Sequence, residues 1–416
     1  MKCPRCGSEM EGDYCSSCGY GLMAEDRSRP SSFDEIKNAI KNSFSLIAVI
    51  SFITFLILNT ALMLWSVDLV APETLTSSKM IYVVFFVVIP VVTISGESFL
   101  AYYIFLLAGV ILSYIALFYK GGNDSFSHIH HIFENLTEKS EKSDSAIPRL
   151  AHVFTALIFV SYFYYILIGA FGVSPRTPSF GELELWSLIL GLTEAAVWEE
   201  VVVRVVFIGL PMLFYGYYKG GKFSSKYLLG GFGLKDKFAI WPILFSSIIF
   251  GIAHIGSWDL YKLVPTFIAG LAFGYLFAKD GLFSCIILHF VWDFLSIPSE
   301  VLNNSYMTNV TVILIFIWMV IGLYFTYNYA KRTVTWLFTS KKKTRQKSLD
   351  HDEQGVLTAG VTAAYVCPQC NNTSAIYTKN GKLRCKRCGN ESEPTAERSQ
   401  KSKQNIQVKR QWPPPE

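Results

Sequence analysis

The sequence is poor in charged residues. Asp, Glu, Lys and Arg make up 17% of its 416 residues, whereas an average soluble domain has about 25%. This low share argues against an ordinary cytosolic enzyme. The HExxH motif of many zinc proteases and the GxSxG motif of serine hydrolases are both missing, so neither motif supports a hydrolase of those kinds. A signal peptide with a small-residue cleavage site is missing too, and we expect no such processing.

Apolar runs fill the middle of the chain. Residues 1–43 and 331–416 are polar, and between them one apolar run follows another. About 20 apolar residues cross the hydrocarbon core of a bilayer. Eight runs qualify, at 44–65, 98–119, 150–172, 183–218, 238–255, 263–278, 282–297 and 308–330. The sequence therefore predicts an all-α polytopic membrane protein with about eight transmembrane helices.

Eight of the nine cysteines form CxxC pairs. One pair brings two thiolates to a metal through a tight turn, and a second pair completes a tetrahedral site. The two sets are Cys3, Cys6, Cys15 and Cys18 near the start, and Cys367, Cys370, Cys385 and Cys388 near the end. We predict two small structural zinc ribbons rather than two disulfide knots, and therefore two termini in the reducing cytosol. The ninth cysteine, Cys285, is predicted to be a small buried apolar residue.

The distribution of basic residues predicts the topology. From Lys331 onward, 17 Lys and Arg oppose 7 Asp and Glu, as is typical of a cytoplasmic flank. Lysines in the loops at 120–149 and 219–237 place these loops on the same side. Two cytosolic ends require an even number of crossings, so we interpret 80–119 as one broken or re-entrant element that crosses once. The alternative of nine crossings would put the first zinc ribbon outside the cytosol.

Ionisable residues lie in three of the apolar runs, each in a motif with a four-residue spacing. Each polar group at lipid depth costs about 2.5–3.5 kcal/mol, so these groups need partners. The pairs are Glu200 with Arg204, Phe250 with His254, and His289 with Asp293. Residues four apart share a helix face, while Glu199 lies about 100° round the helix from Glu200. We expect the three helices to meet and enclose a small polar cavity.

Two chemistries remain open for this cavity. A carboxylate shielded from bulk water beside a histidine is suited to activate a water molecule. Alternatively, Glu199, His254 and His289 form the two-His, one-Glu set of a catalytic zinc site. Glu194 lies five residues before Glu199, nearly opposite on an α-helix, and is expected to be a lining or interface residue.

The ordered motifs EExxxR, FxxxH and HxxxD within residues 183–297 resemble the CPBP family, which comprises the CAAX prenyl endopeptidases and the bacteriocin-processing or self-immunity proteins. The resemblance implies an eight-helix intramembrane endopeptidase that hydrolyses a peptide bond with glutamate-activated water. A catalytic metal is less favoured by this resemblance.

The resemblance also implies roles for the matching residues. Glu199 would activate water, with His254 as its partner on that water. His289 and Asp293 would stabilise the oxyanion. The supporting residues would be the ion pair Glu200 and Arg204, and Phe250, which would shape the pocket.

The chain departs from the family pattern at two positions. Asp293 stands where the prenyl endopeptidases usually have Asn, and a carboxylate donates to an oxyanion only when protonated. Asp293 could instead accept from His289 and orient it. Val205 follows the arginine, where many relatives have Gly.

The predicted organisation has seven segments. They are an N-terminal zinc ribbon (1–25), a linker with a short interfacial helix (26–43), N-terminal transmembrane helices (44–172), a CPBP-like catalytic core (173–330), a basic flexible linker (331–364), a C-terminal zinc ribbon (365–392) and a disordered tail (393–416). Phe33, Ile36 and Ile40 supply the apolar face of the interfacial helix.

Two other function classes compete with an endopeptidase. A non-catalytic membrane adaptor or immunity protein would act through its zinc ribbons on a cytosolic partner. A transporter would show internal repeats, and the two halves show no convincing repeat. The expected partners are membrane lipid and a peptide or lipidated protein substrate in the cell membrane. The ribbons lack interleaved aromatic and basic residues, which disfavours nucleic acid.

Overall fold

The computed structural model describes residues 8, 9, 17, 32–84, 87–138, 145–176, 178, 182–220, 224–234, 236–302, 305–353, 369, 375–377, 383–385 and 388–392. The chain divides into two compact units, Met1–Tyr329 and Ala330–Glu416. The whole N-terminal cysteine set, together with Cys367 and Cys370, lies outside the described residues.

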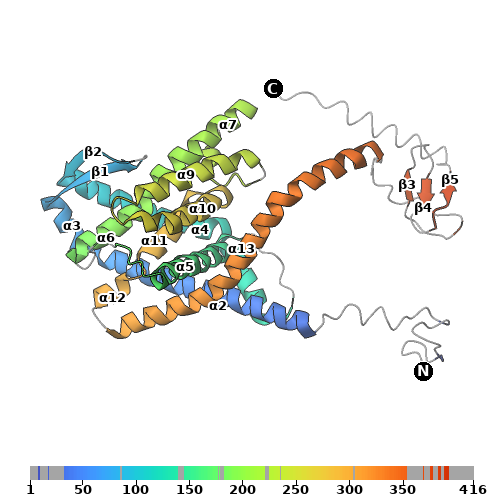
Figure 1. Cartoon of the computed structure of the whole chain (residues 1–416), viewed down its shortest axis with the longest axis horizontal. Coiled ribbons are helices and arrows are strands. Elements are labelled where there is room, and N and C mark those ends of the chain that lie inside the picture. The colour runs from blue at the N-terminus through green and yellow to red at the C-terminus, as the bar shows by residue number, and fades with distance from the viewer. Residues whose placement is uncertain are drawn as a thin grey trace. The chain divides into compact units, whose positions relative to one another are not determined.

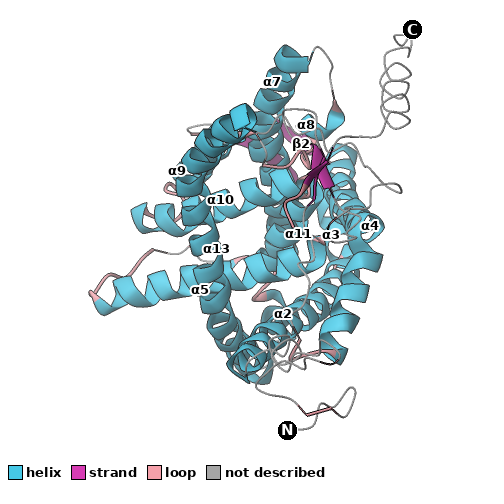
Figure 2. Cartoon of the chain, turned by 90° about the vertical axis from the view of Figure 1, so that its right-hand side faces the viewer, coloured by secondary structure: helices cyan, strands magenta, loops and turns pink. Residues whose placement is uncertain are grey.

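Helices make up most of the first unit (Figures 1 and 2). They are α2 (Ser32–Trp65), α3 (Val67–Thr76), α4 (Glu97–Glu134), α5 (Ala146–Ala170), α6 (Leu185–Glu194), the π-helices η2 (Ala195–Glu199) and η3 (Val201–Gly209), α7 (Leu210–Gly220), α8 (Ser225–Leu228), the 3₁₀-helix η4 (Lys237–Ala239), α9 (Ile240–Ala253), the 3₁₀-helix η5 (Leu260–Lys262), α10 (Leu263–Lys279), α11 (Leu282–Asp293), α12 (Ile297–Leu302) and α13 (Ser305–Glu353). Each of the eight apolar runs expected from the sequence is mostly helical, and the run 282–297 is interrupted between α11 and α12. The predicted all-α polytopic membrane fold is confirmed.

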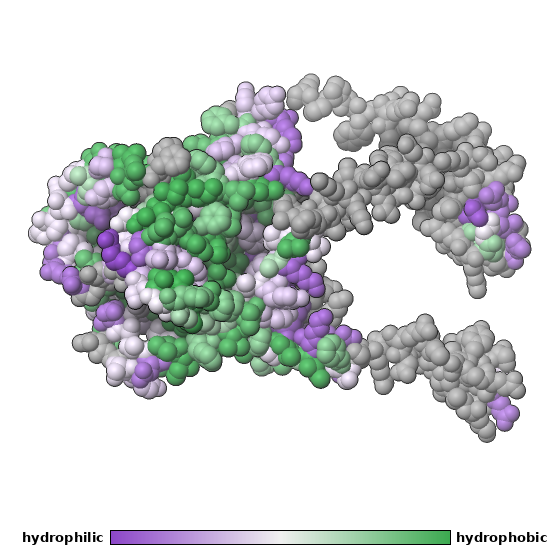
Figure 3. Space-filling model, in the orientation of Figure 1, coloured by the Kyte–Doolittle hydropathy of each residue, from purple (hydrophilic) through white to green (hydrophobic). Residues whose placement is uncertain are grey.

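Five helices in the described part of the chain are long and apolar enough to cross a membrane: α2, α4, α5, Leu260–Lys279 and Ser305–Thr335. Two shorter apolar helices are Lys237–Ala253 and Leu282–Asp293. Large apolar side chains gather on the outside of the bundle (Figure 3). Such a surface suits lipid rather than water, because a bilayer does not penalise exposed hydrocarbon.

Aromatic packing and close backbone contacts hold the bundle together. Phe154 of α5 packs edge-on against Trp318 of α13, with ring centroids 5.0 Å apart, and Trp318 Nε1 donates to Ser51 Oγ of α2 at 2.8 Å. Gly322 of α13 lies so close to α5 that a Cβ there would be 2.0 Å from the Thr155 carbonyl oxygen. Small residues at such crossings let membrane helices approach closely.

β1 (Ser78–Val84) and β2 (Val88–Ser95) pair as an antiparallel β-hairpin. The expectation that 80–119 is one element is therefore wrong, because β2 ends at Ser95 and α4 begins at Glu97. α4 is long and apolar enough for the single crossing expected in this region. Tyr82 pairs with Pro90 next to an irregularity in the register. Pro90 has no N–H to donate, so the Tyr82 carbonyl takes a partner outside the hairpin.

The ends of the long helices also differ from expectation. The predicted interfacial helix is not separate, because α2 runs without a break from Ser32 to Trp65. At the other end, α13 continues to Glu353, so part of the segment 331–364, predicted to be flexible, is helical. Lys, Arg and Gln in 341–347 are good helix formers.

The second unit contains a small antiparallel sheet with the order β3 (Ala375–Tyr377), β4 (Leu383–Cys385) and β5 (Glu391–Ser392). Cys385 ends β4 and is buried, and Cys388 lies in the following turn. The Gly389 N–H donates to the Cys385 carbonyl at 3.0 Å with Gly389 at a φ of 75°. This hydrogen bond, from the residue after the second cysteine back to the first, suits a CxxC metal knuckle, and zinc itself stays a prediction.

Candidate active site

A continuous helical segment, Leu185–Gly220, carries the first polar motif and changes its winding there. It starts as α6, passes through η2 and η3, and continues as α7 (Figure 1). π-helical turns use i→i+5 hydrogen bonds, are rare, and often occur at functional sites. The winding corrects one expectation: Glu194 and Glu199 line the same cavity and do not lie on nearly opposite sides, because five residues make about one turn of a π-helix.

Behind the cavity, Glu200 and Arg204 form a fully buried ion pair. Arg204 Nε lies 2.8 Å from Glu200 Oε2, and both side chains have no exposed area. Arg204 Nη1 donates to Ser246 Oγ of α9 at 2.9 Å, and that hydroxyl donates to the Val203 carbonyl at 3.1 Å. The guanidinium also lies 4.8 Å from the Phe250 ring centroid. The buried cation is thus neutralised, hydrogen-bonded and covered, as burial of a charge requires.

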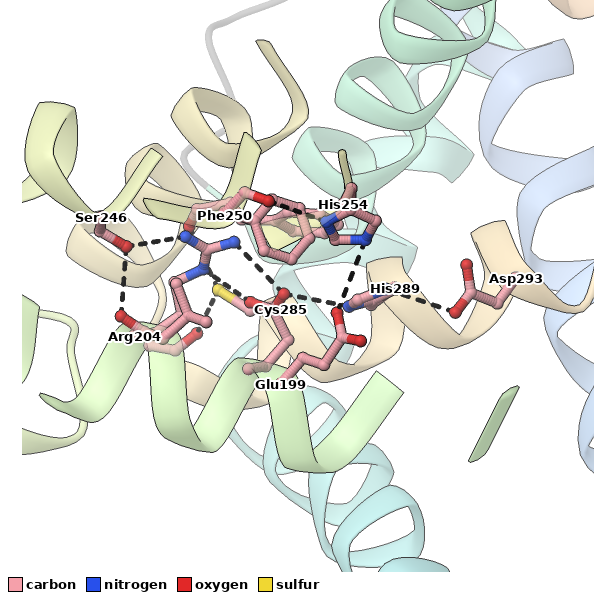
Figure 4. A network of polar contacts seen from close by, with 12 residues as sticks. Glu199, Arg204, Ser246, Phe250, His254, Cys285, His289 and Asp293 are labelled. Carbon is pink, nitrogen blue, oxygen red and sulfur yellow. Dashed lines mark hydrogen bonds and ion pairs between the residues drawn. The ribbon is translucent and has the colours of Figure 1, made fainter. Parts of the chain in front are cut away.

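His289 of α11 lies between two carboxylates. Its Nδ1 is 3.0 Å from Glu200 Oε1 and its Nε2 is 3.3 Å from Asp293 Oδ2. The ring also stacks on Phe273 at 5.2 Å. A carboxylate oxygen only accepts hydrogen bonds, so both ring nitrogens are placed to donate. The row Ser246, Arg204, Glu200, His289 and Asp293 therefore links three helices (Figure 4).

Glu199 faces His254 across the cavity. Glu199 Oε2 and His254 Nε2 are 3.9 Å apart, with side chains 28% and 21% exposed. His254 Nδ1 lies 2.8 Å from the Phe250 carbonyl oxygen. Because a carbonyl oxygen accepts, Nδ1 carries a hydrogen, and in the neutral imidazole Nε2 presents its lone pair to Glu199. Two acceptors thus face one another at a distance too long for a direct hydrogen bond.

The cavity has a volume of about 440 Å³. Its lining includes Glu199, His254, His289, Asp293 and Phe250, so the structure brings these predicted residues together. Glu200 and Arg204 meet the same group from behind. This cavity size is within the range of small-ligand sites in proteins.

The β-hairpin forms part of the cavity wall through Tyr82 and Val88. It is tied to the helical segment that bears Glu199 by two contacts. Trp198 Nε1 donates to the Tyr82 carbonyl at 2.6 Å, and Lys79 Nζ lies 2.6 Å from Glu194 Oε2. The hairpin position is therefore coupled to the residues beside Glu199.

Sequence reasoning missed several residues of this region. Ser246 precedes Phe250 by four residues and His254 by eight, so helical spacing could have placed it on the same face. Lys262 lines the cavity, with Nζ 3.5 Å from the Trp258 ring centroid, and its charge interacts with Asp293 and Glu199. The sequence feature that could have identified Lys262 is its position directly before the apolar run 263–278. The contacts of Trp198 and the hairpin had no signal in the spacing.

A catalytic zinc site was the alternative hypothesis for Glu199, His254 and His289. Within the described ranges no group of three or more His, Cys, Asp and Glu side chains is arranged to hold a metal ion. The catalytic metal was not favoured from the sequence, and this expectation stays a prediction.

The fold and the site define a class of protein: a polytopic membrane protein whose apolar helices enclose a cavity lined by carboxylates and histidines. Residues 181–295 match the family model described as Type II CAAX prenyl endopeptidase Rce1-like. The match contains all three motifs and confirms the resemblance to the CPBP family over this segment. The hairpin and both cysteine sets lie outside it. Neither a curated protein nor a solved structure matches the chain.

Proposed function

We propose that the protein is an intramembrane endopeptidase of the CAAX-protease type, which hydrolyses a peptide bond of a membrane-associated substrate with water activated by Glu199. The observation that carries this proposal is the facing pair of acceptors, Glu199 Oε2 and His254 Nε2, 3.9 Å apart at the cavity surface. A water molecule that donates one hydrogen to each of them directs its own lone pair into the cavity, where a substrate carbonyl carbon can be attacked.

In this mechanism the water oxygen forms a bond to the carbonyl carbon while Glu199 takes one proton of the water. The carbonyl oxygen becomes the oxyanion of a tetrahedral intermediate. The carbon–nitrogen bond then breaks, and Glu199 delivers its proton to the leaving nitrogen, so that an acid and an amine are released. The low-dielectric surroundings strengthen each of these electrostatic interactions.

In this mechanism, the positive charge of His289 opposes the charge of the oxyanion. Glu200 and Asp293 accept from its two ring nitrogens, which fixes the ring and favours its positively charged form. Asp293 then acts as an acceptor that orients His289, which agrees with a carboxylate at this position in place of the family's usual amide. Arg204 keeps Glu200 ionised and directed at His289.

A glutamate mechanism is favoured over a metalloprotease by the surroundings of His289. A zinc ligand needs a nitrogen lone pair, and both nitrogens of His289 face carboxylate oxygens at 3.0 and 3.3 Å. Structural zinc in the two cysteine ribbons is a separate proposal, supported by the tight Cys385–Gly389 turn.

The test is a proteomic comparison of membranes that carry wild-type protein or Glu199→Gln. Glu97→Gln is a matched control, since it removes an exposed carboxylate of α4. A fragment present with wild type and Glu97→Gln, and missing with Glu199→Gln, is the expected result. If Glu199→Gln retains every fragment and full cellular activity while zinc-ligand variants do not, the adaptor function is correct instead.

A further inference from the structure

A second cavity, of about 320 Å³, lies between the ends of several helices in the first unit. It shares no lining residue with the catalytic cavity. Three lysines from three separate elements line it: Lys120 of α4, Lys226 of α8 and Lys279 at the end of α10. Three like charges around one cavity repel one another unless an anion lies between them.

The lysine side chains are held beside the cavity. Lys120 Nζ lies 4.9 Å from the centroid of the Phe283 ring, and Phe283 is itself part of the lining. Neither Lys120 nor Lys226 forms an ion pair with another residue in the part of the chain that the structure describes. Their charges are thus available to a ligand.

Carboxylates offset only part of this positive charge. Asp280 lines the cavity but forms a buried ion pair with Arg149, whose side chain is 8% exposed. Among the described lining residues, Asp124 is then the carboxylate left to oppose Lys120 and Lys226. These residues leave an excess of positive charge.

The backbone around the cavity adds to its positive electrostatic potential. Ser145 and Ala146, at the start of α5, line it, and the first turn of α5 has no acidic residue. The amino end of this 25-residue helix carries partial positive charge. Gly230 and Gly231 also line the cavity, with φ of 84° and 82°. A Cβ on Gly230 would be 2.3 Å from the Phe277 carbonyl oxygen, so only glycine lets the backbone lie this close to α10.

The cavity lies at the membrane boundary. Lys120 directly follows the apolar run 98–119, and Lys279 directly follows the run 263–278. Lys120 lies in α4 and Lys226 in α8, within the segments 120–149 and 219–237 that their lysines are expected to place in the cytosol. Basic pockets between transmembrane helices at this level bind the head groups of anionic lipids.

We propose that this cavity binds the negatively charged phosphate group of an anionic phospholipid head group. The ammonium groups of Lys120, Lys226 and Lys279 surround the phosphate oxygens, and the start of α5 supplies backbone N–H groups. A free phosphate ion has the same chemistry, and the experiment separates the two sources.

The test measures thermal unfolding of the full chain in neutral detergent with three probes: short-chain phosphatidylglycerol, the matching phosphatidylcholine and inorganic phosphate. Phosphatidylglycerol is expected to raise the wild-type midpoint. The triple variant Lys120→Gln, Lys226→Gln, Lys279→Gln should bind it ~100-fold more weakly, since each lysine near an anionic head group changes affinity ~5-fold. If inorganic phosphate raises the unfolding midpoint and phosphatidylglycerol does not, the cavity binds the free ion rather than a lipid head group.

The matched control is Lys37→Gln, Lys331→Gln, Arg332→Gln, which removes the same charge from exposed positions outside the cavity. It should respond as wild type does. Should the triple variant be less stable without ligand, the pair Lys120→Gln and Lys226→Gln changes only exposed residues and replaces it. Each of three results would overturn the proposal. Phosphatidylcholine could stabilise the wild type as much as phosphatidylglycerol does, or the wild type could respond to none of the probes. The cavity and control variants could also lose phosphatidylglycerol affinity to the same extent.

Discussion

Glu199 and Glu200 are neighbours in the sequence but lie in different surroundings. Glu199 is 28% exposed at the cavity, whereas Glu200 is fully buried between Arg204 and His289. One carboxylate can therefore reach water and substrate, and the other holds positive charges in place. Removal of either should abolish cleavage for different reasons.

Glu199→Gln should lower kcat by ~10²–10⁴ while the free energy of unfolding stays nearly unchanged, because an amide fits the same space but cannot take a proton. Glu200→Gln should instead cost ~3–5 kcal/mol of stability, since Arg204 then lacks its buried counter-ion. The rate at which the cleaved fragment forms and the unfolding midpoint, measured on the same samples, distinguish the two variants. Equal losses of stability in both variants would contradict this assignment.

Asp293 offers a second comparison. Asp293→Asn keeps an oxygen that accepts from His289 Nε2 and should retain activity within ~10-fold, whereas Asp293→Leu removes the acceptor and should lose up to ~100-fold. The pH profile of kcat should also change in the Leu variant if Asp293 orients His289. If the two variants lose activity equally with unchanged profiles, Asp293 has only a packing role.

The four-residue spacings predicted Glu200 with Arg204 and His289 with Asp293, because one helix fixes both members of each pair. Residue spacing within one helix could not predict the contacts between different helices. The hydrogen bond of Arg204 to Ser246 and the contact of Glu200 with His289 depend on how α9 and α11 pack against the segment Leu185–Gly220.

At the scale of elements, hydropathy predicted the helices because a backbone in lipid must satisfy its hydrogen bonds within each segment. The hairpin and the π-turns were not predicted. Residues 80–95 are as apolar as a helix, although their valines and isoleucines and Pro90 are typical of an edge strand. The π-turns change residue spacing without changing composition.

The hairpin is expected to depend on its contact with Glu194. Lys79→Met should speed hydrogen exchange of the amides in β1 and β2, because the side chains of this pair are only 29% and 14% exposed and their ion pair is therefore shielded from water. Exchange in α5 should stay unchanged. Glu73→Gln, which changes a nearby carboxylate outside this contact, is the control. Unchanged exchange in the hairpin would contradict a stabilising role for the ion pair of Lys79 with Glu194.

At the scale of the molecule, the chain joins an apolar bundle that carries all the residues of the candidate site to polar ends that carry eight cysteines. The family match covers residues 181–295, so the cysteine sets are additions to the shared core. Separate compositions suggest separate physical roles: the apolar surface of the bundle suits lipid, and the CxxC pairs are predicted to bind a metal in a reducing compartment.

Counting bound metal tests both parts of the chain together. Elemental analysis of purified wild type should give two zinc ions per chain, one for each cysteine set, because each set has the four thiolates of a structural site. Cys6→Ser and Cys388→Ser should each lower the count by one, and Cys285→Ser, at a buried position in α11, should not change it. Glu199→Gln should also keep two, since Glu199 acts on water directly. A third zinc ion that Glu199→Gln or His254→Gln removes would instead establish a metalloprotease. Metal counting is the sharper measurement, because a chelator that strips the cysteine sets would unfold them and lower activity under either mechanism.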